Sequence, residues 1–307
     1  MEAASVQAGT PKRRSRGVGE RRLAAYMVSP SVLLIALVAA YPIAYAVWLS
    51  LHQYSVRQAG LSRWAEPNIW SNYTNVLSDE EFQQSIVNTF IFTFFSVGLE
   101  LVIGLGMALA MHSAFRGQGL LRTVVLVPWA VLTVVTAIMW RTIFDPTLGI
   151  VNAALGTDVV WLGETPYAMI VMIIADVWKT APFMALLILA GLQVIPGEIY
   201  EAAKVDGATM WQRFRKITLP LVTPAILVAL IFRTLDALRI FDLPFVLTKG
   251  QNNTNTMSLE SYQTFQANNI LGEGSAMAII TFVIVMVVSF LYIRFVGGNI
   301  RGLAEDS

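Results

Sequence analysis

Long runs without a single charged residue constrain this chain most strongly. Residues 23–51 and 274–293 contain no Asp, Glu, Lys or Arg. A spanning helix needs about 20 apolar residues, because a bilayer core is about 30 Å thick and a helix rises about 1.5 Å per residue. Of all 307 residues, 56% are hydrophobic and 13% are charged, which is more apolar than a soluble domain of this size requires. The two runs therefore predict membrane-spanning helices.

Four further apolar segments extend this pattern along the chain. Residues 123–140 form a shorter uncharged run, and three longer segments carry internal charges. Together they predict an all-α polytopic membrane protein with six transmembrane helices in one domain, residues 23–297. The spans are expected at about residues 25–51, 86–111, 120–141, 167–192, 217–240 and 274–296.

Lys and Arg residues are distributed unequally between the two sides of this topology. With the N-terminus inside, the inner segments hold 14 of them, and the outer loops hold Arg57, Arg63, Arg141 and Lys249. Cytoplasmic loops are enriched in these residues. We therefore expect both termini in the cytoplasm, with residues 1–22 as a disordered basic tail and residues 298–307 as a second tail.

The loop between the fourth and fifth spans carries a spaced pattern of small and apolar residues. It reads Glu201-Ala202-Ala203, then Gly207 after three residues, and Ile217 and Leu219-Pro220 after nine more. Pro196 and Glu198 favour the start of a helix, and Gly207 can end it and reverse the chain. A second short helix is expected at about residues 209–216. The small side chains of the first helix would let another protein approach closely.

These residues, at this spacing, resemble the EAA signature of ABC importer permeases. The context in residues 195–200, 205–208 and 217–220 resembles the carbohydrate-uptake branch, which includes maltose and glycerol-phosphate permeases. The likeness covers about residues 27–297 and implies a type I ABC importer permease fold. It further implies that two cytoplasmic coupling helices, within residues 197–216, dock into a groove of a separate ATPase. The residues matched to this role are Glu201, Ala202, Ala203, Asp206, Gly207, Ile217, Leu219 and Pro220.

The resemblance also implies partners and a class of cargo. The partners are a second, homologous six-span permease, two copies of a P-loop ATPase that binds ATP and Mg, and an extracytoplasmic sugar-binding protein. This chain itself would bind no cofactor and no metal. Residues 233–242 look most like the first permease of a disaccharide importer, with trehalose as the leading cargo and maltose-type oligosaccharides or glycerol-3-phosphate next. A phosphate ester favours an outer basic cluster, and the outer loops hold few basic residues.

The chain lacks the residues of several kinds of catalytic site. It has no Cys, and His52 and His112 fall on opposite membrane faces in the expected topology. No Gly-x-x-x-x-Gly-Lys-[Ser/Thr] phosphate loop occurs, so the chain cannot hydrolyse ATP in the P-loop manner. We therefore expect a transport subunit and not an enzyme, driven by a partner. The alternative is a self-sufficient secondary carrier or channel, with Asp176, Lys179 and Asp236 as an ion relay.

Several charges fall inside the expected spans, where they are costly and face a cavity or a partner. Asp176 and Lys179 lie three apart, and Arg233, Asp236 and Arg239 repeat this spacing, so each set could neutralise itself on one helix face. Glu100 stands alone among Gly98, Gly104 and Gly106, which favour close helix packing. These charges either tie helices together or line a passage. The candidates for the passage are Asn88, Trp140, Asp176, Asp236, Arg239 and Asp242.

The outer loop between the fifth and sixth spans is rich in amides and aromatic residues. Such a loop either docks an external binding protein or is simply solvated. The docking candidates are Asn252, Asn253, Tyr262 and Gln266.

Overall fold

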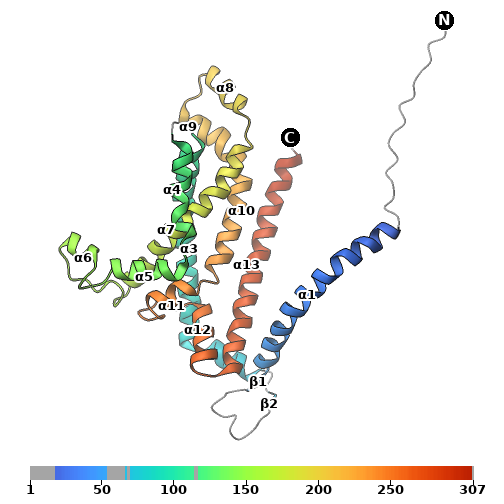
Figure 1. Cartoon of the computed structure of the whole chain (residues 1–307), viewed down its shortest axis with the longest axis vertical. Coiled ribbons are helices and arrows are strands. Elements are labelled where there is room, and N and C mark those ends of the chain that lie inside the picture. The colour runs from blue at the N-terminus through green and yellow to red at the C-terminus, as the bar shows by residue number, and fades with distance from the viewer. Residues whose placement is uncertain (1–17, 54–65, 68–69, 114–116, 306–307) are drawn as a thin grey trace. The chain divides into compact units, whose positions relative to one another are not determined.

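The computed structural model describes residues 18–53, 66–67, 70–113 and 117–305, most of them in helices (Figure 1). Residues 1–17, most of the expected N-terminal tail, lie outside the described residues. The chain divides into two units, residues 1–48 and 49–307. The first unit holds most of α1 (Val18–Ser50), a helix that contains Pro30 and Pro42. Along it, the rings of Tyr41, Tyr45 and Trp48 stack in series.

The second unit is a bundle built on α3 (Glu80–His112), α7 (Tyr167–Gln193) and α10 (Leu219–Ala237). The three helices pack against one another around buried Met172, Met184 and Ile188. α13 (Leu271–Glu305) packs on α10, and Thr234 and Tyr292 share a hydrogen bond of 3.0 Å between their hydroxyls. In the part of the chain that the structure describes, five helices are long and apolar enough to cross a membrane, or six if one bent pair counts as a span.

Short elements connect the long helices. At one end, β1 (His52–Gln53) pairs antiparallel with β2 (Glu66–Pro67), and α2 (Ser71–Ser78) packs on α13. Asp79 then caps α3 by accepting a hydrogen bond of 2.8 Å from the backbone nitrogen of Glu81. After α10 the chain forms α11 (Asp242–Leu247), α12 (Met257–Tyr262) and the π-helical turn η2 (Gln263–Ala267). α12 and η2 pack on α13, and α11 packs on α7 and on α5 (Thr133–Ile143).

Glycines let two helix pairs approach closely. A Cβ placed on Gly104 of α3 would lie 2.8 Å from Met184 Cγ, and one on Gly191 of α7 would lie 2.3 Å from Ala225 Cβ of α10. Gly98 and Gly106 have nothing within 4 Å of such an atom. Among the residues that the structure describes, Gly104 is therefore the one of the three glycines near Glu100 that serves close helix packing.

The expected third span, residues 120–141, is not one straight helix. The structure has α4 (Gln118–Ala130) and α5 (Thr133–Ile143), bent by 90° to each other, and α5 and α6 (Ile150–Leu155) project sideways in Figure 1. Pro128 cannot donate a backbone hydrogen bond, and Val131 and Leu132 are extended, with ψ of 136° and 138°. The apolar run predicted one long helix. Instead, the extended residues Val131 and Leu132 interrupt it between Ala130 and Thr133.

The fifth span also differs from expectation. The second short helix of the loop, α9 (Met210–Arg213), continues through a π-helical turn, η1 (Phe214–Thr218), into α10 without a break. Pro220 therefore lies inside a continuous helix, which begins at Met210, before the expected start of the span at residue 217. A π-turn can absorb the backbone bond that a proline removes, which explains why the helix continues.

Candidate functional site

The loop of residues 195–220, called the signature loop below, lies at one end of the bundle. α8 (Gly197–Val205) follows Pro196, whose φ and ψ of −62° and 136° are those of a residue just before a helix (Figure 1). Gly207 has φ of +76°, and the backbone nitrogen of Ala208 returns to the oxygen of Ala203 at 2.9 Å. A Cβ on Gly207 would meet nothing within 4 Å. The turn therefore requires glycine for its backbone angle and not for space.

The matched signature residues are distributed over this loop with different exposure. Glu201, Ala202, Asp206, Gly207 and Pro220 are exposed, and Ala203, Ile217 and Leu219 are half-buried. Thr209 and Gln212 cap α9 reciprocally, with Thr209 N donating to Gln212 Oε1 at 2.8 Å. Tyr200 on α8 and Thr218 in η1 share a hydrogen bond of 3.1 Å, which fixes the first helix to the second.

Apolar side chains that the sequence analysis did not select are exposed on the signature loop and at Val194, the residue before it. Val194, Val205, Met210 and Trp211 have exposed fractions of 80%, 88%, 79% and 67%. A groove of about 1040 Å³ runs between α8, α9 and the end of α3, and Tyr200, Glu201, Met210 and Trp211 line part of it. Apolar residues gathered on one surface mark protein contacts. The signal in the sequence was the pair of large apolar residues Met210 and Trp211, directly before the polar residues Gln212 and Arg213.

Four charged side chains inside the bundle join three helices and form the Arg233 cluster: Arg233 and Asp236 on α10, Glu100 on α3 and Asp176 on α7. Arg233 Nε donates to Glu100 Oε2 at 2.5 Å, and Nη2 donates to Glu100 Oε1 and Asp176 Oδ2, each at 2.7 Å. Nη1 donates to Asp236 Oδ2 at 2.6 Å. The side chains of Arg233, Glu100 and Asp176 are buried, whereas 69% of the Asp236 side chain is exposed. The guanidinium thus ties α3, α7 and α10 together.

The self-neutralising sets expected from the spacing form only in part. Arg233 and Asp236 do pair, three residues apart. Lys179 does not pair with Asp176: its Nζ donates to the carbonyl oxygens of Val131, at 2.9 Å, and Trp129, at 3.4 Å. Arg239 donates through Nε to the carbonyl of Leu235 at 3.1 Å. Lys179 therefore caps the carbonyls freed at the bend between α4 and α5.

Replacing Lys179 with Met should loosen this bend. The carbonyls of Trp129 and Val131 would lose their donor at a half-buried bend, and we expect the free energy of unfolding to fall by ~1 kcal/mol. Thermal unfolding of the purified protein measures this, with Lys216→Met, an exposed cation, as control. Because the chain has no cysteine, a Leu132→Cys label can report the bend directly. Unchanged unfolding and unchanged labelling would show that the lysine does not hold the bend.

The remaining passage candidates lie in different surroundings. Asn88 is buried and donates to the carbonyl of Asn255 at 3.0 Å and to Asn253 Oδ1 at 3.5 Å, so it fixes the outer loop to α3. Trp140 lies within an aromatic group, stacked on Phe144 and edge-on to Trp178. Asp242 is exposed in the first turn of α11.

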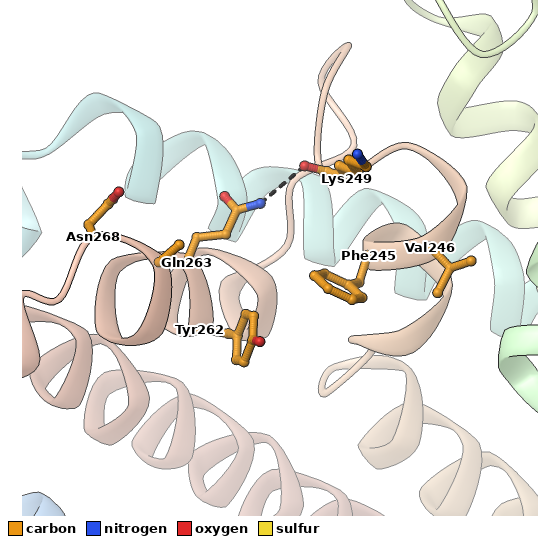
Figure 2. A pocket seen from close by; sticks show the side chains of 7 residues that line it. Phe245, Val246, Lys249, Tyr262, Gln263 and Asn268 are labelled. Carbon is orange, nitrogen blue, oxygen red and sulfur yellow. Dashed lines mark hydrogen bonds between the residues drawn. The ribbon is translucent and has the colours of Figure 1, made fainter.

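Of the four docking candidates, Tyr262 lines a cleft of about 520 Å³ between α11 and α12, and Asn252, Asn253 and Gln266 do not line it (Figure 2). Tyr262 and Phe245 line it, their rings edge-on with centroids 5.6 Å apart, and Gln263 Nε2 donates to the carbonyl of Lys249 at 3.1 Å. Asn252 and Asn253 have φ of +55° and +62°, and Asn252 Nδ2 bonds to the carbonyl of Leu162 at 2.8 Å. Gln266 is exposed in η2. The structure therefore places Tyr262 of α12 against Phe245 of α11. Asn252 and Asn253 lie on the loop between these two helices.

Burial raises the pKa of Glu260, a residue of α12, above its usual range. Its carboxylate accepts hydrogen bonds from the side chains of Asn255 and Thr264, and these bonds oppose the shift. The buried carboxyl group of Glu260 therefore fixes the loop between α11 and α12 through its hydrogen bond with Asn255.

The chain matches known proteins over most of its length. Residues 101–301 match the family described as binding-protein-dependent transport system inner membrane component. The chain is 41% identical to the trehalose transport system permease protein SugA of Mycobacterium tuberculosis over 290 residues, which cover 93% of this chain and 92% of that protein. It is also 41% identical to the trehalose/maltose transport system permease protein MalF of Thermococcus litoralis, covering 90% and 94%.

A solved structure has the same fold. A chain of a bacterial ABC transporter involved in the import of the acidic polysaccharide alginate superposes with a TM-score of 0.78. The superposition covers 91% of this chain and 96% of that chain, at 22% identity. At this identity, the similarity shows that the two chains share a fold, and it does not show that they transport the same cargo.

Proposed function

This chain belongs to the family of inner membrane components of binding-protein-dependent transport systems, and from that membership we propose that it is the permease subunit of an ATP-driven importer that carries a sugar inward. A disaccharide such as trehalose is the proposed cargo. The names of two relatives, at 41% identity over nearly the whole chain, support it: one is a trehalose permease and the other a trehalose/maltose permease. Oligosaccharides and glycerol-3-phosphate are weaker candidates.

The proposed assembly contains a second, homologous permease, two copies of a cytoplasmic P-loop ATPase that binds ATP and Mg, and an external sugar-binding protein. Both termini and the signature loop then face the cytoplasm, and the outer cleft beside Tyr262 faces the binding protein. The Lys and Arg distribution supports this orientation. The position of α8 and α9 at one end of the bundle, away from α12, is consistent with it (Figure 1).

The observation that carries this proposal is the signature loop. α8 carries the small side chains of Ala202 and Ala203, and the exposed apolar residues Val205 and Met210 flank the turn that follows it. Met210 also lines the groove. An isolated loop would leave this apolar surface in water, whereas a groove of the ATPase would cover it. α8 is attached to α7, and α9 is continuous with α10. A movement of the ATPase would therefore be transmitted directly to two helices of the Arg233 cluster.

Within this proposal, Asp236, Arg239, Asp242 and Trp140 remain candidates for the passage. Asp176 is held by Arg233 and is better suited to fixing the helices than to meeting a solute. The same contacts count against the ion-relay alternative, because Asp176 is bonded to Arg233 and Lys179 to backbone carbonyls.

The experiment that tests the proposal introduces a charge at the turn of the signature loop. Gly207→Asp and Gly207→Asn have nearly the same shape, and both tolerate a left-handed backbone better than other residues do. We expect Gly207→Asp to lower ATP-dependent trehalose uptake and ATPase co-purification about tenfold or more, because it buries an unpaired charge in the contact. Gly207→Asn should retain most of both.

Uptake is measured in vesicles that contain this chain, its partner permease and the ATPase, with the binding protein supplied. Equal loss in the two variants would show that backbone strain, and not docking, is responsible. Uptake that continues without ATP or ATPase would identify a secondary carrier and refute the proposed function.

A further inference from the structure

The outer cleft, between α11 and α12, has a wall of two aromatic rings. Phe245 and Tyr262 line it, and each is 40% exposed (Figure 2). Behind them, the ring of Phe241 stacks on Phe245, with centroids 5.3 Å apart, and lies edge-on to Tyr262 at 5.0 Å. Three rings that support one another in this way lose little freedom when a ligand binds. The wall is therefore preorganised.

Polar side chains lie beside this wall. Lys249, Gln263 and Asn268 line the same cleft. Within the part of the chain that the structure describes, no hydrogen bond engages the Lys249 ammonium, the Asn268 amide group or the Tyr262 hydroxyl. These groups offer both donors and acceptors. A cavity of about 520 Å³ with aromatic walls and a few polar groups is typical of small-molecule sites, which measure about 300–1,000 Å³.

Both sides of the cleft are held in place by unusual backbone. Lys249 has φ of +57°, a strained value for a residue other than glycine, and Gln263 Nε2 holds its carbonyl at 3.1 Å. Opposite, η2 is a π-helical turn that packs tightly on α13, where a Cβ on Gly274 would lie 2.6 Å from Phe265 Cβ. Strained residues and π-turns are concentrated at functional sites. These features favour a binding site over a solvated loop.

We propose that the outer cleft is a sugar-binding site of the permease itself, which takes one pyranose ring of the cargo as it enters. A pyranose has an apolar C–H face that can pack on Phe245 or Tyr262, and hydroxyls at its edge that donate and accept hydrogen bonds. An acyl chain or an apolar peptide side chain would also cover the rings, but would leave Lys249 and Asn268 without partners. This inference rests on the proposed function and deepens it.

The test measures protection of a thiol placed in the cleft. Ala267→Cys adds one to the lining, and this chain has no other cysteine. The purified complex of both permeases and the ATPase, without the binding protein, is labelled with a maleimide at increasing trehalose concentration. Saturating trehalose should slow labelling of this chain at least about fivefold, because a pocket covers most of a bound ligand.

Two controls separate the cleft from general effects of the sugar. Labelling of Ala154→Cys, on exposed α6, should not change with trehalose. Sorbitol, an open-chain polyol with many hydroxyls and no ring, should not protect Ala267→Cys.

Substitutions in the Ala267→Cys background separate the ring from the polar groups. Tyr262→Ala should raise the half-protecting trehalose concentration about tenfold, because it removes the stacking surface, whereas Tyr262→Phe keeps the ring and should raise it only about threefold. Asn268→Ala, at an exposed position where folding is not at risk, should also raise it about threefold.

Four results overturn the inference: no protection by trehalose, equal protection by sorbitol, protection unchanged by Tyr262→Ala, or a thiol that is already inaccessible without sugar because a partner subunit covers it. Protection by the sugar-free binding protein and not by trehalose would identify a docking surface instead. Trehalose uptake by the complete system is measured in parallel. No uptake refutes the proposed function, whereas uptake without protection refutes only the role of the cleft.

Discussion

Replacing Arg233 with Met should almost abolish folded protein. Glu100 and Asp176, both buried, would lose the partner that now binds them at 2.5 to 2.7 Å. Removing one partner of a buried ion pair costs ~3–5 kcal/mol, because the remaining charge stays desolvated. A domain is typically stable by only ~5–15 kcal/mol. The loss should appear as little monodisperse protein after detergent extraction and a strongly lowered unfolding temperature.

Two further variants separate the charge of Arg233 from its geometry. Arg233→Lys keeps the charge but replaces a planar fork by a single ammonium, which cannot bond Glu100 and Asp176 as the guanidinium does, so it should rescue only partly. Arg233→Met combined with Glu100→Gln and Asp176→Asn should restore more folded protein than Arg233→Met alone, since no unpaired buried charge remains. Equal yields of native protein and Arg233→Met would show that the cluster does not hold the helices.

The second large effect is expected at the crossing of α7 and α10. Gly191→Leu should destabilise the chain strongly, because even the first added carbon would lie 2.3 Å from Ala225 Cβ and 3.2 Å from Val222 Cγ2. Overpacking of this kind costs ~1–3 kcal/mol or more, and an alanine methyl group cannot rotate away. Because α7 leads into α8 and α10 follows η1, the signature loop should also shift. Thermal unfolding and ATPase co-purification measure the two consequences.

A glycine in open surroundings provides the control for Gly191. Gly98→Leu adds the same side chain to a helix where nothing lies within 4 Å of a new Cβ. We expect it to be neutral or slightly stabilising within this chain, since Leu favours helix over Gly by up to ~1 kcal/mol. If both variants lower stability equally, the added leucine side chain as such, and not the close approach of α7 and α10, accounts for the effect.

The chemical character of the segments was predictable from the sequence because it depends on local properties. In α7 and α13, runs of apolar residues must form helices in a membrane, where no water can satisfy the backbone. The turn at Gly207 was predictable for the same kind of reason, because few residues other than glycine adopt a φ of +76° readily. The spacing also predicted the pair of Arg233 with Asp236, since residues three apart share a helix face.

The bend at residues 131–132 and the partners of the buried charges were decided only by tertiary structure. Lys179 meets the carbonyl of Val131, 48 residues away in sequence, and Arg233 meets Glu100, 133 residues away. No local pattern favours Arg233 over Lys179 as the partner of Asp176. The spacing along α7 predicted Lys179, and this prediction was wrong, because Asp176 pairs with Arg233. A charge at membrane depth binds whichever counterpart the packed helices bring within reach. The sequence therefore determined which segments are apolar enough to span a membrane, and the packing of α3, α7 and α10 determined which charges pair with one another.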